Sequence, residues 1–266
     1  MIESTLTRRS VIGHAVAGAG LITSLGAAHA QAAPKTFVLV HGGWVGGWYW
    51  RRVTDQLQAK GHRVYAPTLT GLGERSHLMS ALITLDTHIT DVVNVIKWED
   101  LNNIVLVGHS YAGFMISGVA ERALHSIGSI VFVDAFLPEN GQRLIDLGRP
   151  ELGAITLTAA ERNEVSRPVP PAKSFGVNEK DQPWVDAKMT PQPTLVSLQP
   201  IALSGARDKV AKKTYIRATA NPQATFEGHF QRVKSDPSWR TYGVPCGHLI
   251  MVDMPDRLVE ILLEVA

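Results

Sequence analysis

Short runs of apolar residues, with almost no polar alternation, recur along the chain and constrain its fold more than any other feature. Residues 36–40, 104–107 and 130–133 read TFVLV, IVLV and IVFV. Such a run is typical of a strand that is buried on both faces of a parallel sheet. Residues 63–66, 214–217 and 240–244 are expected to form three further strands.

Stretches with a helical spacing of apolar residues separate these runs. Trp50, Val53 and Leu57 form one stripe, which a left-handed cap at Gly61 is expected to end. Other helices are expected around residues 89–96, over about 223–233, and from Pro255 onwards. This alternation predicts an α/β fold with an open, mostly parallel sheet of six or slightly more strands and helices on both faces. Ligands of such sheets bind beyond the carboxyl ends of the strands.

The alternation breaks between Leu137 and Lys213. Most of the 15 prolines fall in this segment. A long irregular insertion inside one domain is usually functional, so we expect residues 137–213, approximately, to form a cap over the ligand site. Residues 31–266 are therefore predicted to be a single domain that carries an inserted cap.

The first 30 residues have the pattern of an export signal. Residues 7–10 read TRRS, a twin-arginine motif, and residues 28–30 read AHA, which fits a signal-peptidase site. An uncleaved membrane anchor is the alternative, but the apolar run between the two is short and interrupted by His14. We expect residues 1–30 to be a twin-arginine signal peptide. The mature protein would be periplasmic or secreted, without stable membrane insertion.

The composition argues against several classes of partner and cofactor. The 266 residues are 45% hydrophobic and 19% charged, with a formal net charge of +2. This near-neutral balance makes nucleic acid a poor partner. Cys246 is the single cysteine, so the sequence offers neither an intramolecular disulfide nor a cysteine-based zinc cluster. No metal or organic cofactor is expected, and no pattern indicates an oligomeric state.

A candidate nucleophile follows one of the predicted strands. Residues 108–113 read GHSYAG and precede a predicted helix. A serine on such a strand-turn-helix segment is lifted clear of the sheet, and its neighbours are small because the turn is tight. The motif departs from Gly-x-Ser-x-Gly, because Ala112 replaces the second glycine. We interpret Ser110 as a nucleophile; a serine that only caps the helix is the alternative.

A serine hydroxyl needs a base to take its proton, and His248 is the best candidate. It follows the last predicted strand in the sequence PCGHLI, at the edge where the strand ends converge. A structural loop histidine is the alternative. His88 and His229 are expected on helix surfaces instead, and His109 lies inside the serine motif.

Asp134 is the candidate acid, because it ends the strand at residues 130–133 and should face the same edge as Ser110. A carboxylate there would hold the imidazole in the required tautomer. The chain order Ser110, Asp134, His248 also fits this architecture. An aspartate that braces a loop is the alternative. Asp208 precedes a strand, which places it at the opposite edge.

A glycine-rich segment, HGGWVGGW at residues 41–48, closes the first strand. Glycines let the backbone approach a developing oxyanion, and we assign its two donors to the amides of Gly43 and Tyr111. A dinucleotide site is a poor alternative, because Gly-x-Gly-x-x-Gly does not occur. Four residues are candidates for an apolar substrate pocket, with core packing as the alternative: Trp44, His109, Phe136 and Trp184.

These segments together resemble an α/β-hydrolase. FVLVHGGW at 37–44, GLGERSH at 71–77, GHSYAG at 108–113 and DAFLP at 134–138 are similar to the compact esterases grouped with plant hydroxynitrile lyases and salicylate methylesterases. The second and fourth segments also resemble bacterial members that hydrolyse esters and carbamate-type compounds. The resemblance covers most of the chain after residue 30 and is patchy in the expected cap.

Two departures from the plant members matter. The resemblance places their aspartate after the fifth strand, where this chain reads TANP at 219–222 without a carboxylate. We therefore move the acid to Asp134, a position that dehalogenase-like branches also use. Lyase members have threonine at the place of Gly42 and lysine at the place of Leu249, so the hydrolase interpretation gains.

The sequence thus predicts a serine hydrolase that cleaves a small hydrophobic carboxylic ester or carbamate through an acyl-enzyme intermediate. Two alternatives stay open. One is a carbon–carbon lyase similar to the hydroxynitrile lyases, and the other is a non-catalytic ligand-binding protein on the same fold.

Overall fold

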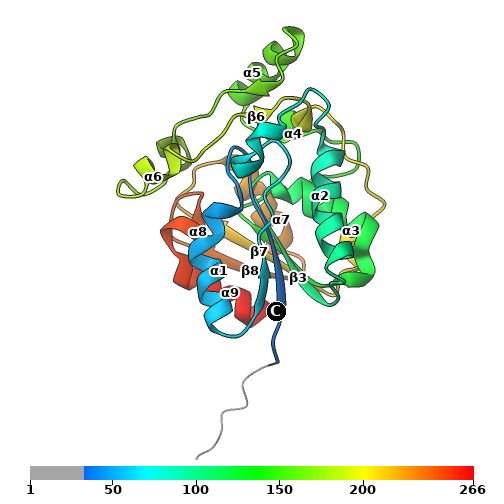
Figure 1. Ribbon diagram of the computed structural model, residues 1–266. Helices are drawn as coiled ribbons and strands as arrows, with labels where there is room; N and C mark the ends of the chain where they lie inside the picture. The colour runs from blue at the N-terminus through cyan, green and yellow to red at the C-terminus, as the bar shows by residue number, and fades with distance from the viewer. Residues whose placement is uncertain (1–32) are drawn as a thin grey trace, which may run out of the picture. The chain divides into compact units, whose positions relative to one another are not determined.

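A sheet of six parallel strands forms the centre of the computed structural model, which describes residues 33–266 (Figure 1). The strand order is β2-β1-β3-β4-β7-β8. The bounds are β1 Thr36–Val40, β2 Arg63–Tyr65, β3 Ile104–His109, β4 Ile127–Val133, β7 Lys212–Ala218 and β8 Trp239–Val244. The predicted fold class is confirmed. The expected signal peptide, residues 1–30, lies outside the described residues.

Helices cover both faces of the sheet (Figure 1). One face carries α1 Arg51–Ala59, α8 Ile250–Asp253 and α9 Pro255–Val265, and the other carries α2 Leu85–Trp98, α3 Ala112–Ala123 and α7 Ala224–Lys234. The short 3-10 helices η1 Gly47–Trp50 and η3 Leu124–Ser126 adjoin α1 and α3, and η2 Gly73–Leu78 lies in the connection between β2 and α2. No helix in the described part of the chain combines the length and the apolar character needed to cross a bilayer.

Alternate residues of each strand enter two separate cores, which explains the continuous apolar runs of the sequence. Val38 and Val40 pack with α2 and α3, whereas Phe37 and Leu39 pack with α1 and α9. Burial of both faces removes the need for polar alternation. β4 begins earlier than the sequence predicted, because Ser129 is buried and its hydroxyl donates to the Val265 carbonyl at 3.1 Å. A polar residue inside this strand therefore carries a tertiary contact.

The segment between β4 and β7 leaves the sheet and passes over the end where β3 and β4 finish (Figure 1). It contains α4 Leu144–Leu147, α5 Pro150–Glu161, β5 Ser166–Arg167, η4 Ala172–Phe175, α6 Gln182–Asp186, β6 Gln192–Pro193, η5 Leu195–Ser197 and η6 Arg207–Lys209. β5 and β6 pair antiparallel as a small ribbon. We refer to residues 137–213 as the cap. Their irregular structure agrees with the proline content that interrupted the sequence pattern.

Two helical glycines differ sharply in the space around them, and this difference gives a test of the packing. A Cβ on Gly113, in α3, would lie 1.8 Å from the Phe136 carbonyl oxygen, whereas a Cβ on Gly228, in α7, would meet nothing within 4 Å. We expect Gly113→Ala to lower the free energy of unfolding by about 3 kcal/mol through overpacking. Gly228→Ala should raise it by about 0.5–1 kcal/mol through helix propensity. Urea denaturation of both variants measures this, and changes of equal sign would contradict the packing.

Candidate active site

Ser110 occupies a strained turn between β3 and α3. Its φ of 56° lies in the left-handed region, which residues other than glycine rarely adopt. Its amide donates to the Val133 carbonyl at 3.2 Å, and its carbonyl accepts from the amides of Gly113 and Phe136, both at 3.1 Å. These bonds fix the turn against the end of β4. The hydroxyl is thereby presented beyond the carboxyl edge of the sheet, as the strand-turn-helix motif predicted.

The replacement of the second motif glycine by Ala112 is accommodated without a clash. Ala112 is fully buried in the core that contains α2 and α3. The close backbone approach falls one residue later, where Gly113 packs against the carbonyl of Phe136. Gly113, and not residue 112, is therefore the position at which a side chain would clash.

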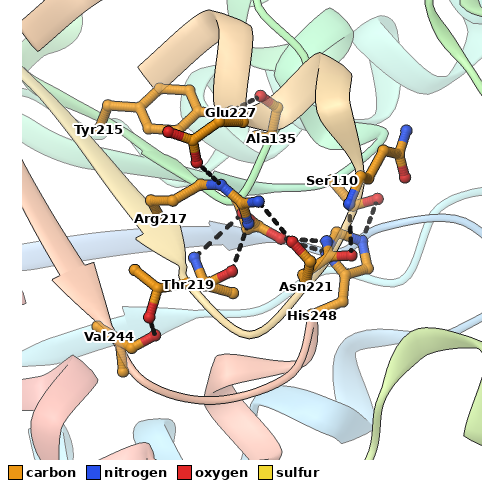
Figure 2. A network of polar contacts seen from close by, with 12 residues as sticks. Ser110, Ala135, Tyr215, Arg217, Thr219, Asn221, Glu227, Val244 and His248 are labelled. Atoms are coloured by element: carbon orange, nitrogen blue, oxygen red, sulfur yellow. Dashed lines mark hydrogen bonds and ion pairs between the residues drawn. The ribbon is translucent and has the colours of Figure 1, made fainter. Parts of the chain in front are cut away.

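His248 lies on the loop between β8 and α8, close to Ser110 (Figure 2), and its ring joins Ser110 to Asp134. Its Nε2 is 2.8 Å from Ser110 Oγ, and its Nδ1 is 2.7 Å from Asp134 Oδ2. Because the Asp134 carboxylate accepts, Nδ1 carries the proton and Nε2 is free to accept from the serine hydroxyl. The structure thus brings the three predicted residues together in the order that proton transfer from a hydroxyl requires.

Asp134 is fully buried, yet its negative charge is well compensated. It accepts from Arg217 Nη1 at 2.7 Å, from the Ala218 amide at 3.1 Å and from Asn221 Nδ2 at 2.7 Å, besides His248. The side chain of Arg217 is itself only 3% exposed. An isolated carboxylate could not stay ionised at such a depth, and these donors replace its lost hydration.

Arg217 and Asn221 were missed by the sequence analysis, although both belong to the site (Figure 2). The register of β4 and β7 brings Arg217 into the site: Val133 pairs with Ile216, and Asp134 therefore lies beside Arg217. Asn221 stands in the TANP segment after β7, where the plant members have their acid. Its amide also lies 3.2 Å from His248 Nδ1. The asparagine therefore supports the displaced carboxylate instead of replacing it.

Gly43 and Tyr111 are the residues whose amides the sequence predicted as oxyanion donors. Both residues line the same cavity as Ser110. Within residues 33–266 neither amide donates to a protein acceptor, whereas the neighbouring amides of Gly42 and Trp44 donate to Tyr49 Oη at 3.0 Å and to Gln192 Oε1 at 2.8 Å. Two backbone donors of residues that line this cavity are thus without a protein acceptor, which is what stabilisation of a developing negative charge requires.

His109 does not line the larger cavity over Ser110, but it borders a second, smaller cavity that Ser110 and His248 also line. Its ring is buried beneath His248, where Nε2 donates to the His248 carbonyl at 2.9 Å. Nδ1 accepts from Tyr49 Oη at 3.0 Å, and Tyr49 in turn accepts from the Gly42 amide. Burial holds the pKa of His109 well below its ordinary value, so the ring is neutral. His109 instead ties the loop of His248 to the glycine-rich segment.

Trp184 is also placed differently from the prediction. Its indole packs edge-on against Trp48, with ring centroids 5.0 Å apart, and its face lies under the Arg52 guanidinium at 5.2 Å. These contacts hold it in the core that contains α1 and α9, and it does not line the described cavities. Core packing, the alternative interpretation, is correct for this residue.

His88 is buried below the serine turn and not on a helix surface; His229 is buried as well. Nε2 of His88 donates to the Thr70 carbonyl at 2.8 Å, and Nδ1 accepts from Tyr111 Oη at 3.2 Å. The ring thereby anchors the side chain of Tyr111, which directly follows Ser110 in the chain. Burial lowers the pKa of His88 from 6.5 to about 4, so the ring is neutral at physiological pH.

A cavity of about 450 Å³ opens over Ser110 and His248, between the strand ends and the cap. Its walls are largely apolar and include the predicted residues Trp44 and Phe136 together with Leu144, Ile145, Phe175 and Phe226. The cap contacts His248 directly, because the His248 amide donates to the Phe175 carbonyl at 2.9 Å. Within the described residues, no cluster of histidine, cysteine, aspartate or glutamate has the arrangement of a metal site.

Comparisons with known proteins agree with this geometry. Residues 37–261 match the model of the "Alpha/beta hydrolase family". A "Carbendazim hydrolyzing esterase" from Nocardioides sp. (strain SG-4G) is 38% identical over 234 residues, which cover 84% of this chain and 96% of that protein. An "Alpha-hydroxynitrile lyase" from Arabidopsis thaliana is 34% identical over 104 residues, 39% of this chain and 40% of that protein.

A solved structure shows the same fold. An extracellular α/β-hydrolase from a Paenibacillus species, described as homologous to tobacco salicylic acid binding protein 2, superposes with a TM-score of 0.77 at 24% identity. The match covers 88% of this chain and 99% of that one. The chain therefore belongs to the α/β-hydrolase family. Its esterase relatives make it an esterase-like hydrolase.

The buried pair of Asp134 and Arg217 provides a test of how the site is stabilised. We expect Arg217→Met to lower the free energy of unfolding by about 3–5 kcal/mol, because Asp134 loses its charge partner. Adding Asp134→Asn removes the uncompensated charge, so the double variant should be less destabilised than the sum of the single variants. Denaturant titrations of the four proteins give the coupling, and strictly additive losses would contradict it.

The neutral His88 predicts a loss of stability in acid. In the unfolded chain this ring takes a proton near pH 6.5, whereas in the folded protein it stays neutral down to about 4. The stabilisation that the neutral ring gives the folded protein is thus complete above pH 6.5. It decreases as the pH falls from 6.5 to about 4, by about 1.4 kcal/mol per pH unit. His88→Gln should flatten the decrease in melting temperature between these pH values. His125→Gln, at an exposed ring, is the control and should leave the slope unchanged.

Proposed function

We propose that this protein is a serine hydrolase that cleaves a small hydrophobic carboxylic ester or carbamate. The observation that carries the proposal is the continuous relay from Ser110 Oγ through the His248 ring to Asp134 Oδ2, with links of 2.8 and 2.7 Å. Its serine end opens into a cavity with two free backbone donors. Nucleophile, base, orienting acid and oxyanion donors are the parts that acyl transfer needs.

In the acylation step, Ser110 Oγ attacks the carbonyl carbon of the substrate while His248 Nε2 takes the hydroxyl proton. The carbonyl electron pair moves onto oxygen, and the Gly43 and Tyr111 amides stabilise the resulting oxyanion. The imidazolium that forms is held by the Asp134 carboxylate. When the tetrahedral intermediate collapses, the proton on Nε2 passes to the leaving alkoxide, which departs as the alcohol.

In the deacylation step, water takes the place of the alcohol. His248 removes one proton from the water, the hydroxide adds to the acyl carbon, and the same two amides hold the second oxyanion. Collapse of this intermediate releases the acid and returns the proton to Ser110. His88 and His109, held neutral by burial, support Tyr111 and the His248 loop structurally and neither gain nor lose a proton in this cycle.

The apolar walls of the cavity support a hydrophobic substrate. Phe175 and Phe226 stack near the His248 ring, with centroids at 6.1 and 5.1 Å, so the reacting bond would lie in a largely dehydrated space. The name of the Nocardioides relative, a carbendazim hydrolyzing esterase, adds carbendazim to the compounds worth testing. A panel of aryl esters, carbamates and carbendazim would define the preferred bond.

Substitutions at the relay test the proposal with a chromogenic short-chain aryl ester. Ser110→Ala should remove nearly all turnover. Asp134→Asn should reduce the rate by roughly 10⁴, if this aspartate orients the imidazole as its counterpart does in serine proteases. Asp208→Asn is the matched control, because Asp208 is exposed and paired only with the neighbouring Arg207. Wild-type rates in Ser110→Ala, or a larger loss in Asp208→Asn than in Asp134→Asn, would refute the assignment.

The rival functions give different outcomes in the same assays. A carbon–carbon lyase would release an aldehyde and cyanide from a cyanohydrin and leave esters intact. A ligand-binding protein would bind without turnover and form no covalent adduct with a serine-directed organophosphate. A stoichiometric adduct on Ser110, seen by mass spectrometry, together with ester turnover, is what the hydrolase proposal expects.

A further inference from the structure

A buried arginine without an acidic partner lies in the cap wall of the cavity. Arg167, in β5, is 4% exposed and lines the cavity. Its Nη1 donates to Thr156 Oγ1 and its Nη2 to Ser197 Oγ, both at 2.8 Å. Both acceptors are neutral hydroxyls. Within residues 33–266 no carboxylate forms an ion pair with this guanidinium.

The hydrogen-bonding capacity of Arg167 is largely unused. A guanidinium has five N–H donors, and the two bonds to hydroxyls leave three without a protein acceptor. Nε in particular is buried and has no partner among the described residues. Burial lowers the pKa of Arg167 to about 10, so the group remains charged at neutral pH. The ring of Trp44, 5.1 Å away, offsets only part of this charge.

A second unpartnered donor faces Arg167 across the ribbon. Gln192, in β6, is the register partner of Arg167 and is 1% exposed. Its Oε1 is engaged by the Trp44 amide at 2.8 Å, which leaves Nε2 as the free end. Nε2 is buried without a hydrogen-bond partner among the described residues, and Gln192 also lines the cavity.

No acidic group in the cavity lining pairs with Arg167 among the described residues. Glu151 is the acidic side chain among the residues that line the described cavity, and it is exposed and forms no ion pair with Arg167. Unsatisfied buried donors cost free energy, and a buried cation costs more. Two unsatisfied donors, Arg167 Nε and Gln192 Nε2, belong to paired residues of one short ribbon, which indicates that a ligand supplies the missing acceptor.

We infer that the β5–β6 ribbon binds a carboxylate of the substrate, a second group besides the ester that Ser110 attacks. This inference rests on the proposed function and specifies its substrate class: esters that carry a second, anionic group. The planar guanidinium of Arg167 matches a carboxylate in bidentate geometry, and the Gln192 amide would supply a further donor. Trp44 links this subsite to the oxyanion donors, because it directly follows Gly43 in the chain.

The same groups would discriminate against neutral esters. A substrate without an acceptor at this position enters the apolar cavity but leaves buried N–H donors unpaired. A site built in this way rejects the analogue that lacks the matching polar group more strongly than any apolar wall could. Arg167 and Gln192 are therefore specificity-determining residues, and the difference between acidic and neutral esters should appear mainly in KM.

Two matched acetate esters test the subsite: 4-acetoxybenzoate, with a para carboxylate, and 4-acetoxybenzamide, its neutral analogue. The quantity measured is the ratio of their kcat/KM values, each divided by the rate of hydroxide-catalysed hydrolysis. The wild type should favour the acid. Arg167→Met should lower the ratio by about 10- to 100-fold, the effect of losing hydrogen bonds from a charged group.

Gln192→Glu is the second variant and guards against a folding defect in Arg167→Met. It keeps an oxygen for the Trp44 amide but places a carboxylate opposite Arg167, where it competes with the carboxylate of the substrate. The ratio should fall as in Arg167→Met. Arg162→Met is the control, because it removes one positive charge from an exposed position of the cap and should leave the ratio unchanged.

The outcomes separate this inference from the function on which it rests. If Ser110→Ala abolishes turnover but the ratio is the same in the wild type, Arg167→Met and Gln192→Glu, the carboxylate subsite is refuted and the hydrolase stands. If Ser110→Ala retains turnover, the serine hydrolase itself is refuted. An equal decrease in the Arg162→Met control would attribute the effect to overall charge and would also overturn the subsite.

Discussion

The fully buried carboxylate of Asp134 is the interaction on which the rest of the site depends. It stands at the end of β4 and is held by donors from β7, from the turn after β7 and from the loop after β8. These donors come from three different parts of the chain. The parallel register of β4, β7 and β8 is therefore a requirement of the chemistry as well as of the core, because a shift would separate Asp134 from Arg217 and His248.

The fold and the reacting residues were accessible from the sequence because their signals are local. Continuous apolar runs mark strands buried on both faces, and all six predicted strands are present within the described residues. Ser110, Asp134 and His248 each follow such a run, and parallel strands bring their carboxyl ends to one edge. The roles assigned to these residues remain predictions that the proposed substitutions test.

The remaining features depend on contacts between distant segments, which a single sequence does not show. Trp184 was assigned to the pocket because it is aromatic and lies in the cap, but its partners Trp48 and Arg52 come from the other end of the chain. His88 reads as a surface residue on its helix until Thr70 and Tyr111 cover it. The unpartnered donors of Arg167 and Gln192 can be recognised only when every hydrogen-bond acceptor around them is known from the structure.

The cap and the sheet form one unit at the site. Besides the bond from His248 to Phe175, the Thr190 amide of the cap donates to the Trp44 carbonyl at 2.8 Å. A Cβ on Gly247 would lie 2.0 Å from the Gly176 carbonyl oxygen, so the loop of the base and the cap touch through their backbones. Any movement that opened the cap would disturb the base and the glycine-rich segment together.

Three residues of this centre, Trp44, Ser110 and Asp134, have φ values of 62°, 56° and 40°. Such conformations cost of order 1–3 kcal/mol each, and they persist only where the surroundings impose them. A glycine at any of these places would relax the chain and delete a working side chain at the same time. Substitutions that relieve this strain and raise the stability would therefore remove side chains on which the proposed activity depends.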